Sequence, residues 1–231
     1  MMDKKTRKFL EGVYPYFMIL DNANKKLLEL MSMGYDNSLH EAEELFYQIL
    51  SDLIRLFPIK IPMKVESVDC GDSKQKDYEN AKVDANSSIL LLKEHIPFLT
   101  EKYNMLLVNV HFVKAMDVMV RVRNKCEHEP HNIRLNSMVG GNGYCSMYVH
   151  YKNEELPMST DILANILYDL NQVFEKIKIL YMKKIEECDA KYKEYPCYKT
   201  ISELDLSLYN QKYSYVPWEN IINDNVIDEE K

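Results

Sequence analysis

Residues 162–181 read ILANILYDLNQVFEKIKILY, and the pattern of apolar residues in this stretch decides the fold class. Apolar side chains recur every three or four positions, which is the spacing of an amphipathic helix that buries one face. The apolar positions are Ile162, Ile166, Leu167, Leu170, Val173, Phe174, Ile177, Leu180 and Tyr181. A similar period, carried by more charged residues, continues towards Tyr195, just before Pro196. We therefore predict a long helix that begins behind Pro157 and runs to about Tyr195.

Helical spacing also precedes this stretch. Apolar residues cluster at 27–31 and again at 45–56, where Ser38 and Glu41 have capping-box spacing and the chain reaches a helix-breaking proline at 58. Residues 98–127 form the longest helical candidate. We expect an all-α bundle in one domain over residues 1–231, with N-terminal helices and a connection over 1–72, a core over 73–195 and an acidic extension over 196–231.

A glycine-rich segment interrupts the helical pattern. Gly140, Gly141, Asn142 and Gly143 lie between two alternating stretches, as in a tight turn that joins two strands. We predict a small β-hairpin near residues 135–151. A phosphate-binding loop is the alternative, but no Lys-Ser or Lys-Thr pair follows the glycines.

Composition limits the class of protein. Hydrophobic residues make up 46% of the chain, which is enough for a sizeable core. The net charge is −7, and residues 202–231 hold seven acidic and two basic residues, so this tail carries −5 of it. The charged N-terminus and the lack of a long apolar run predict a cytoplasmic protein that does not enter a membrane. Five widely spaced cysteines, without any C-x-x-C pair, predict free thiols.

A cluster of chemically active residues lies on the last turns of the longest helical candidate. Residues 118–132 read VMVRVRNKCEHEPHN. If the helix persists to His128, Asn124 and His128 lie on one face, and the side chain of Arg123 is long enough to reach the same place. Pro130 ends the helix, so His128 lies near carbonyl groups that favour its protonated form. An arginine, an amide and an imidazole suit metal-independent RNA cleavage, which needs proton transfer and positive charge beside a phosphate.

The segment from Arg123 to His128 is an R-x4-H motif with a polar residue directly after the arginine. It resembles the signature of the HEPN superfamily. The resemblance implies a helical bundle that dimerises with the motif at the interface and acts as a metal-independent endoribonuclease, leaving a 2′,3′-cyclic phosphate, in toxin–antitoxin, abortive-infection or phage-defence systems. It implies that Arg123 and His128 are the catalytic pair and that Asn124 assists them. The core over residues 73–195 would then be the HEPN-like part of the chain.

Further expectations concern partners and cofactors. Arg121, Lys125, His131 and Arg134 are candidate RNA contacts, and an antitoxin or another regulatory protein is a candidate partner. We expect a homodimer, no cofactor and no metal. Zinc is the alternative at Cys126, His128 and His131, with Cys145 and His150 nearby, but the spacing of Cys126 and His128 on a helix does not bring them together.

Two simpler interpretations remain beside these. Basic residues at the end of a helix stabilise its dipole and need no substrate. The alternative to catalysis is therefore that the motif is a solvated helix end in a non-catalytic module that binds a partner protein or a nucleotide. The tyrosine-rich segment YSYVPW at 213–218 could stack on bases, but packing against its own domain is the preferred interpretation.

Overall fold

The computed structural model describes residues 4–33, 39–56, 115, 118–119, 122–126, 128, 133–139, 145–151, 154–187, 193 and 196–218. These residues are mostly helical, in agreement with the prediction, and they include one small antiparallel sheet. The long helices are α1 (Lys4–Ser32), α2 (Leu39–Leu56) and α6 (Thr160–Glu186), and the short ones are α7 (Pro196–Glu203) and α8 (Ser207–Asn210). The strands are β1 (Ile133–Val139), β2 (Cys145–Tyr151) and β3 (Glu154–Ser159).

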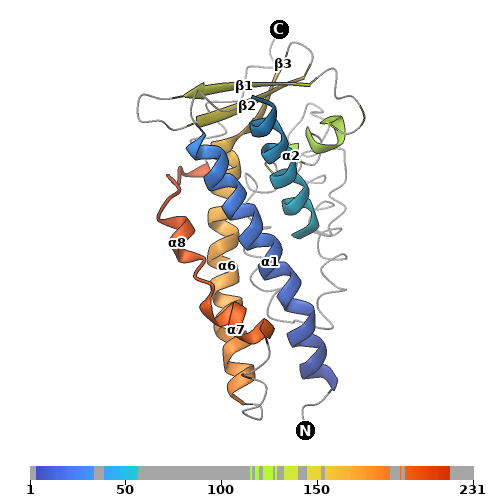
Figure 1. The fold of residues 1–231 in the computed structure, drawn as a ribbon, viewed down its shortest axis with the longest axis vertical. Helices are drawn as coiled ribbons and strands as arrows, with labels where there is room; N and C mark the ends of the chain where they lie inside the picture. Colours follow the sequence, from blue (N-terminus) through green and yellow to red (C-terminus); the bar gives the residue numbers. More distant parts are fainter. Residues whose placement is uncertain are drawn as a thin grey trace, which may run out of the picture.

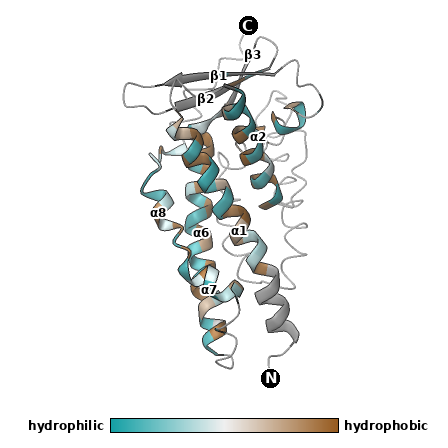
Figure 2. Ribbon diagram, in the orientation of Figure 1, coloured by the Kyte–Doolittle hydropathy of each residue, from teal (hydrophilic) through white to brown (hydrophobic). Residues whose placement is uncertain are grey.

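Helices α1 and α6 form the centre of the bundle, with α2 against α1 and the sheet across one end (Figure 1). Each long helix has a hydrophobic side and a polar side (Figure 2), so the apolar stripes face one another. At the centre, Phe17 of α1 meets Phe174 of α6 edge to face, with ring centroids 5.1 Å apart. Both side chains are fully buried, and so is Phe46 of α2. Trp218, which is the last described residue, is only 1% exposed.

The predicted hairpin is present and gains a third strand. β1 pairs with β2 in antiparallel register from Ile133 opposite Tyr151 to Val139 opposite Cys145. β3 then pairs with the other edge of β2, with an irregularity at Tyr148 and Val149. The helix predicted behind Pro157 begins at Thr160, and Pro157 itself lies in β3. An edge strand tolerates a proline, because the missing N–H can face away from the neighbouring strand.

The helix α6 begins as predicted but ends early. Ser159 closes β3 and caps α6, since its Oγ accepts a hydrogen bond from the backbone N–H of Ile162 at 3.3 Å. The helix stops at Glu186, and the prediction that it runs to about Tyr195 is wrong. After Ile185, which is buried, the sequence is dominated by charged residues that offer little apolar surface to hold a further turn against the bundle.

The C-terminal segment, residues 196–218, belongs to the core. Ile201, Leu206, Tyr213 and Trp218 are buried in it, which confirms the packing interpretation of the tyrosine-rich segment for Tyr213 and Trp218. Tyr215, in contrast, is 40% exposed and lies on Tyr168 of α6 at a centroid distance of 4.5 Å. The remainder of the predicted acidic extension, residues 219–231, lies outside the described residues.

Side chains of α1 and α6 attach this segment through hydrogen bonds. Asn24 and Asn171, both fully buried, exchange two amide hydrogen bonds of 2.8 and 2.9 Å. Tyr213 donates its hydroxyl to Asn24 Oδ1 at 2.8 Å, and Asn171 donates a second bond to Asn210 Oδ1 at 2.9 Å. These bonds satisfy polar groups that would be costly to bury alone, so they fix where the segment crosses the two helices.

None of the helices in the described ranges combines the length and the apolar character that crossing a membrane requires.

Candidate functional site

The R-x4-H motif lies on helical turns beside the core. Residues 122–126 and 128 are helical, and we refer to them as the motif turns. Val122 is fully buried together with Met119, so one face of these turns is fixed against the bundle. Arg123 is half-buried, and its Nη1 donates a hydrogen bond to Asn124 Oδ1 at 3.1 Å. An amide oxygen that accepts from the guanidinium limits the directions in which the remaining donors point.

His128 differs from Arg123 in its environment. It is exposed to solvent, as a group that exchanges protons with a substrate must be. Lys125 and Cys126, between the two predicted catalytic residues, are half-buried. Cys126 is a reduced thiol that forms no disulfide with the described residues. The motif turns therefore carry an oriented arginine and, about one turn later, an accessible imidazole.

The other residues that were predicted to contact RNA do not all lie on the motif turns. Arg121 and His131 lie outside the described residues. Arg134 lies in β1, where its partner across the antiparallel pair is His150 of β2. Arg123, Asn124 and Lys125 thus lie together on the motif turns, whereas Arg134 belongs to the sheet.

Tyr47 of α2 is a residue of this site that the sequence did not indicate. Its hydroxyl lies within hydrogen-bonding reach of the Cys126 thiol, and the carboxylate of Glu43 lies close enough to act on it. Burial, then the Cys126 thiol and Glu43, raise the pKa of Tyr47 well above its ordinary value. The hydroxyl therefore keeps its proton at all physiological pH values. The one local signal is that Glu43 and Tyr47 are four residues apart, on one face of a helix.

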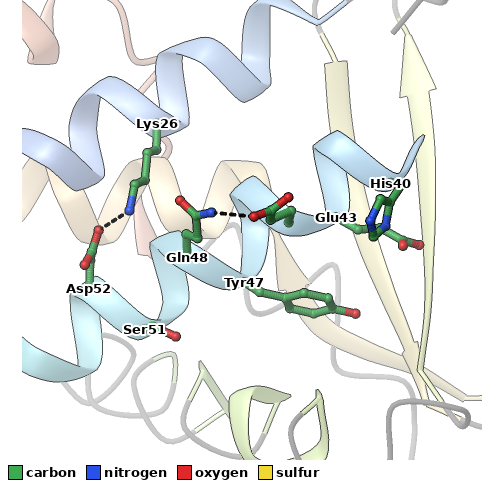
Figure 3. Close-up of a pocket in the computed structure, with 8 residues that line it drawn as sticks. Lys26, His40, Glu43, Tyr47, Gln48, Ser51 and Asp52 are labelled. Atoms are coloured by element: carbon green, nitrogen blue, oxygen red, sulfur yellow. Dashed lines mark hydrogen bonds and ion pairs between the residues drawn. The ribbon is translucent and has the colours of Figure 1, made fainter. Parts of the chain in front are cut away.

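A groove runs along this face of α2 (Figure 3). It has a volume of about 400 Å³ and is lined by Lys26, His40, Glu43, Glu44, Tyr47, Gln48, Ser51 and Asp52. At one end, Lys26 Nζ of α1 forms an ion pair with Asp52 Oδ2 at 2.7 Å, and Asn22 also donates to Asp52 at 3.1 Å. In the middle, Gln48 Nε2 donates to Glu44 Oε1 at 3.1 Å. Tyr47 forms part of the groove wall and also contacts the motif turns.

Within the described part of the chain, no three His, Cys, Asp or Glu side chains come together in a way that could hold a metal ion. The alternative zinc set includes His131, which lies outside that part.

Comparison of the chain with protein-family models, with curated proteins and with solved structures finds no match in any of the three.

Proposed function

We propose that this protein is a metal-independent endoribonuclease of the HEPN type, in which Arg123, Asn124 and His128 act on RNA. The observation that carries the proposal is the hydrogen bond of 3.1 Å from Arg123 Nη1 to Asn124 Oδ1, about one helical turn before an exposed His128. It gives the R-x4-H motif an oriented guanidinium and an accessible imidazole. A buried His128 would have argued against catalysis.

The reaction follows from these groups. The 2′-hydroxyl of a ribose loses its proton to a base and attacks the adjacent phosphorus, while the bond to the 5′-oxygen of the next nucleotide breaks and that oxygen takes a proton from an acid. The products are a 2′,3′-cyclic phosphate and a 5′-hydroxyl. Arg123 stabilises the negative charge that builds up on the phosphate oxygens. His128 serves as acid or base.

One chain supplies one such histidine, so the proposal includes a two-fold dimer in which two copies of His128 act in one cleft. In this arrangement Arg121, Lys125, His131 and Arg134 contact the RNA backbone. The proposal also includes a HEPN-like bundle over residues 73–195, a cytoplasmic location, and a role as a toxin or phage-defence effector restrained by an antitoxin or regulatory protein.

The test compares purified wild-type, His128→Ala and Arg123→Ala proteins on total RNA in the presence of EDTA, followed by mapping of the cut ends. Loss of the proton-transfer group should lower the rate roughly 100-fold or more, and loss of the arginine should lower it by a similar factor. Arg55→Ala is the matched control, because Arg55 is an exposed arginine on α2 with 70% of its side chain accessible. Circular dichroism establishes that each variant is folded.

Wild-type fragments that end in a 2′,3′-cyclic phosphate, absent with both motif variants and retained with Arg55→Ala, would support the proposal. Equal cutting by His128→Ala would contradict the assigned role. If no protein cuts RNA, the motif turns act as a binding surface for a protein or nucleotide partner instead.

A further inference from the structure

The groove along α2 has the size of a small-molecule site. Its volume of about 400 Å³ lies within the range of roughly 300–1,000 Å³ in which such ligands bind. Figure 3 shows the side chains of Tyr47, Gln48 and Ser51 placed along it, between the ion pair at one end and His40 at the other. Seven of the eight lining residues therefore come from α2, and each of the eight carries a polar group beside the apolar part of its side chain.

The chemistry of the lining does not suit a phosphate. The side chain of Lys26 is only 18% exposed and its ammonium group is paired with Asp52, so its charge is already balanced. Glu43 and Glu44 add two more carboxylates. An anion placed among these groups would be repelled, whereas a neutral ligand with N–H or O–H donors would find acceptors.

The lining also offers groups that can recognise a planar heterocycle. The amide of Gln48 has two N–H donors and one oxygen acceptor, and the bond to Glu44 uses one of those donors. Glu43 is half-buried, and its carboxylate lies close enough to Tyr47 to raise the pKa of the tyrosine. Carboxylates accept hydrogen bonds from amino groups of bases, and side-chain amides can both donate to and accept from a base edge.

Tyr47 joins this groove to the motif turns. It belongs to the groove wall and its hydroxyl reaches Cys126, which lies three residues after Arg123. Three residues along a helix correspond to a rise of about 4.5 Å. The groove thus begins about one helical turn from the arginine that is proposed to hold the phosphate.

We propose that the groove along α2 is the subsite for one nucleoside of a single-stranded RNA, next to the phosphate that Arg123 binds. This inference rests on the proposed ribonuclease function. The two parts of the site differ in charge. The motif turns bring positive charge to the phosphate, and the groove presents neutral and acidic groups to the base and ribose. Single-stranded RNA is required, because only an unstacked base can leave its neighbours and enter a groove.

The groove should prefer bases that present amino and ring N–H donors side by side. Guanine offers N1–H and its exocyclic amino group to one carboxylate, while uracil offers a single N3–H. Substituting Glu43→Gln keeps the size of the side chain but removes the carboxylate, so guanosine should bind at least about tenfold more weakly.

The experiment titrates guanosine and uridine into the full-length wild-type protein and into Glu43→Gln and Gln48→Ala, with binding followed by calorimetry. Glu41→Gln is the matched control, because Glu41 is an exposed carboxylate on the same helix but does not line the groove. We expect guanosine to bind more tightly than uridine, to lose affinity in the two groove variants, and to bind normally to Glu41→Gln. Absence of guanosine binding at millimolar concentration, or equal affinity in all variants, would overturn the inference.

The same variants separate the two proposals. Suppose that the wild type cleaves RNA and that Glu43→Gln changes neither the guanosine affinity nor the base preference at the cut site. This result would refute the proposed subsite and leave the proposed nuclease intact. Guanosine binding that depends on Glu43, without any RNA cleavage by the wild type, would remove the nuclease and leave a nucleoside-binding groove.

Discussion

Replacing Asn171 with alanine should destabilise the protein more than any other single amide substitution on α6. The side chain is fully buried and takes part in three hydrogen bonds, two with Asn24 at 2.8 and 2.9 Å and one with Asn210 at 2.9 Å. A typical net contribution is about 1 kcal/mol for each bond, so the free energy of unfolding should fall by about 3 kcal/mol. The substitution also leaves the buried amide of Asn24 with fewer partners, which acts in the same direction.

For a chain of this size, 1 kcal/mol corresponds to about 2–4 °C in the melting temperature, so Asn171→Ala should melt about 6–12 °C below the wild type. Thermal and urea unfolding followed by circular dichroism measure both quantities. Gln172→Ala is the matched control, because Gln172 is the next residue on α6 and is exposed. A change of less than about 0.5 kcal/mol is expected there. If Asn171→Ala unfolds no earlier than Gln172→Ala, the amide network does not hold the bundle together.

Three further outcomes follow from buried polar contacts. Lys26→Met leaves the nearly buried Asp52 carboxylate without its ammonium partner, so the free energy of unfolding in urea should fall by about 3 kcal/mol. The double variant Lys26→Met and Asp52→Leu should recover most of that loss. Burial raises the pKa of Asp169 above its ordinary value of 3.8, so the folded chain keeps this proton to higher pH than the unfolded chain does. The free energy of unfolding therefore falls as the pH rises from about 4 through the pKa of the folded state. Asp169→Asn keeps an acceptor for Trp218 Nε1, so its melting temperature should rise relative to that of the wild type as the pH increases above about 4. Deleting residues 196–231 removes buried Trp218 and should abolish cooperative unfolding, whereas a persistent sharp transition would show that the remaining helices fold alone.

The sequence predicted the elements whose signals are local. The helix of residues 162–181 has an unbroken apolar stripe, and all of it lies within α6. The hairpin was predicted from glycines between alternating stretches, and β1 and β2 pair around that turn. Spacing within a few residues is enough in both cases, because the hydrogen bonds of a helix and of a hairpin join near neighbours in the chain.

Most of the missed features depend on residues that are far apart in the chain. The exception is β3, which directly follows β2 and was missed because its six residues include Pro157, which a strand tolerates at an edge. The path of the C-terminal segment depends on Asn24 of α1 meeting Tyr213. In the candidate site, Arg123 and His128 could be named from the R-x4-H spacing, but Tyr47 could not, because its partner Cys126 follows only from the packing of α2 on the motif turns.

The position of the candidate site therefore depends on α2 more than on the motif itself. Helix α2 packs on α1, and α1 is joined to α6 by the Asn24–Asn171 pair, so the rigid core sets the direction of α2. Tyr47 of α2 then contacts Cys126 and so positions the motif turns relative to α2. Because a phenylalanine keeps the ring but lacks the hydroxyl, Tyr47→Phe should preserve the groove wall and loosen only the connection to the motif turns. RNA cleavage should then weaken while guanosine still binds, and an unchanged cleavage rate would show that the motif turns are held by the core alone.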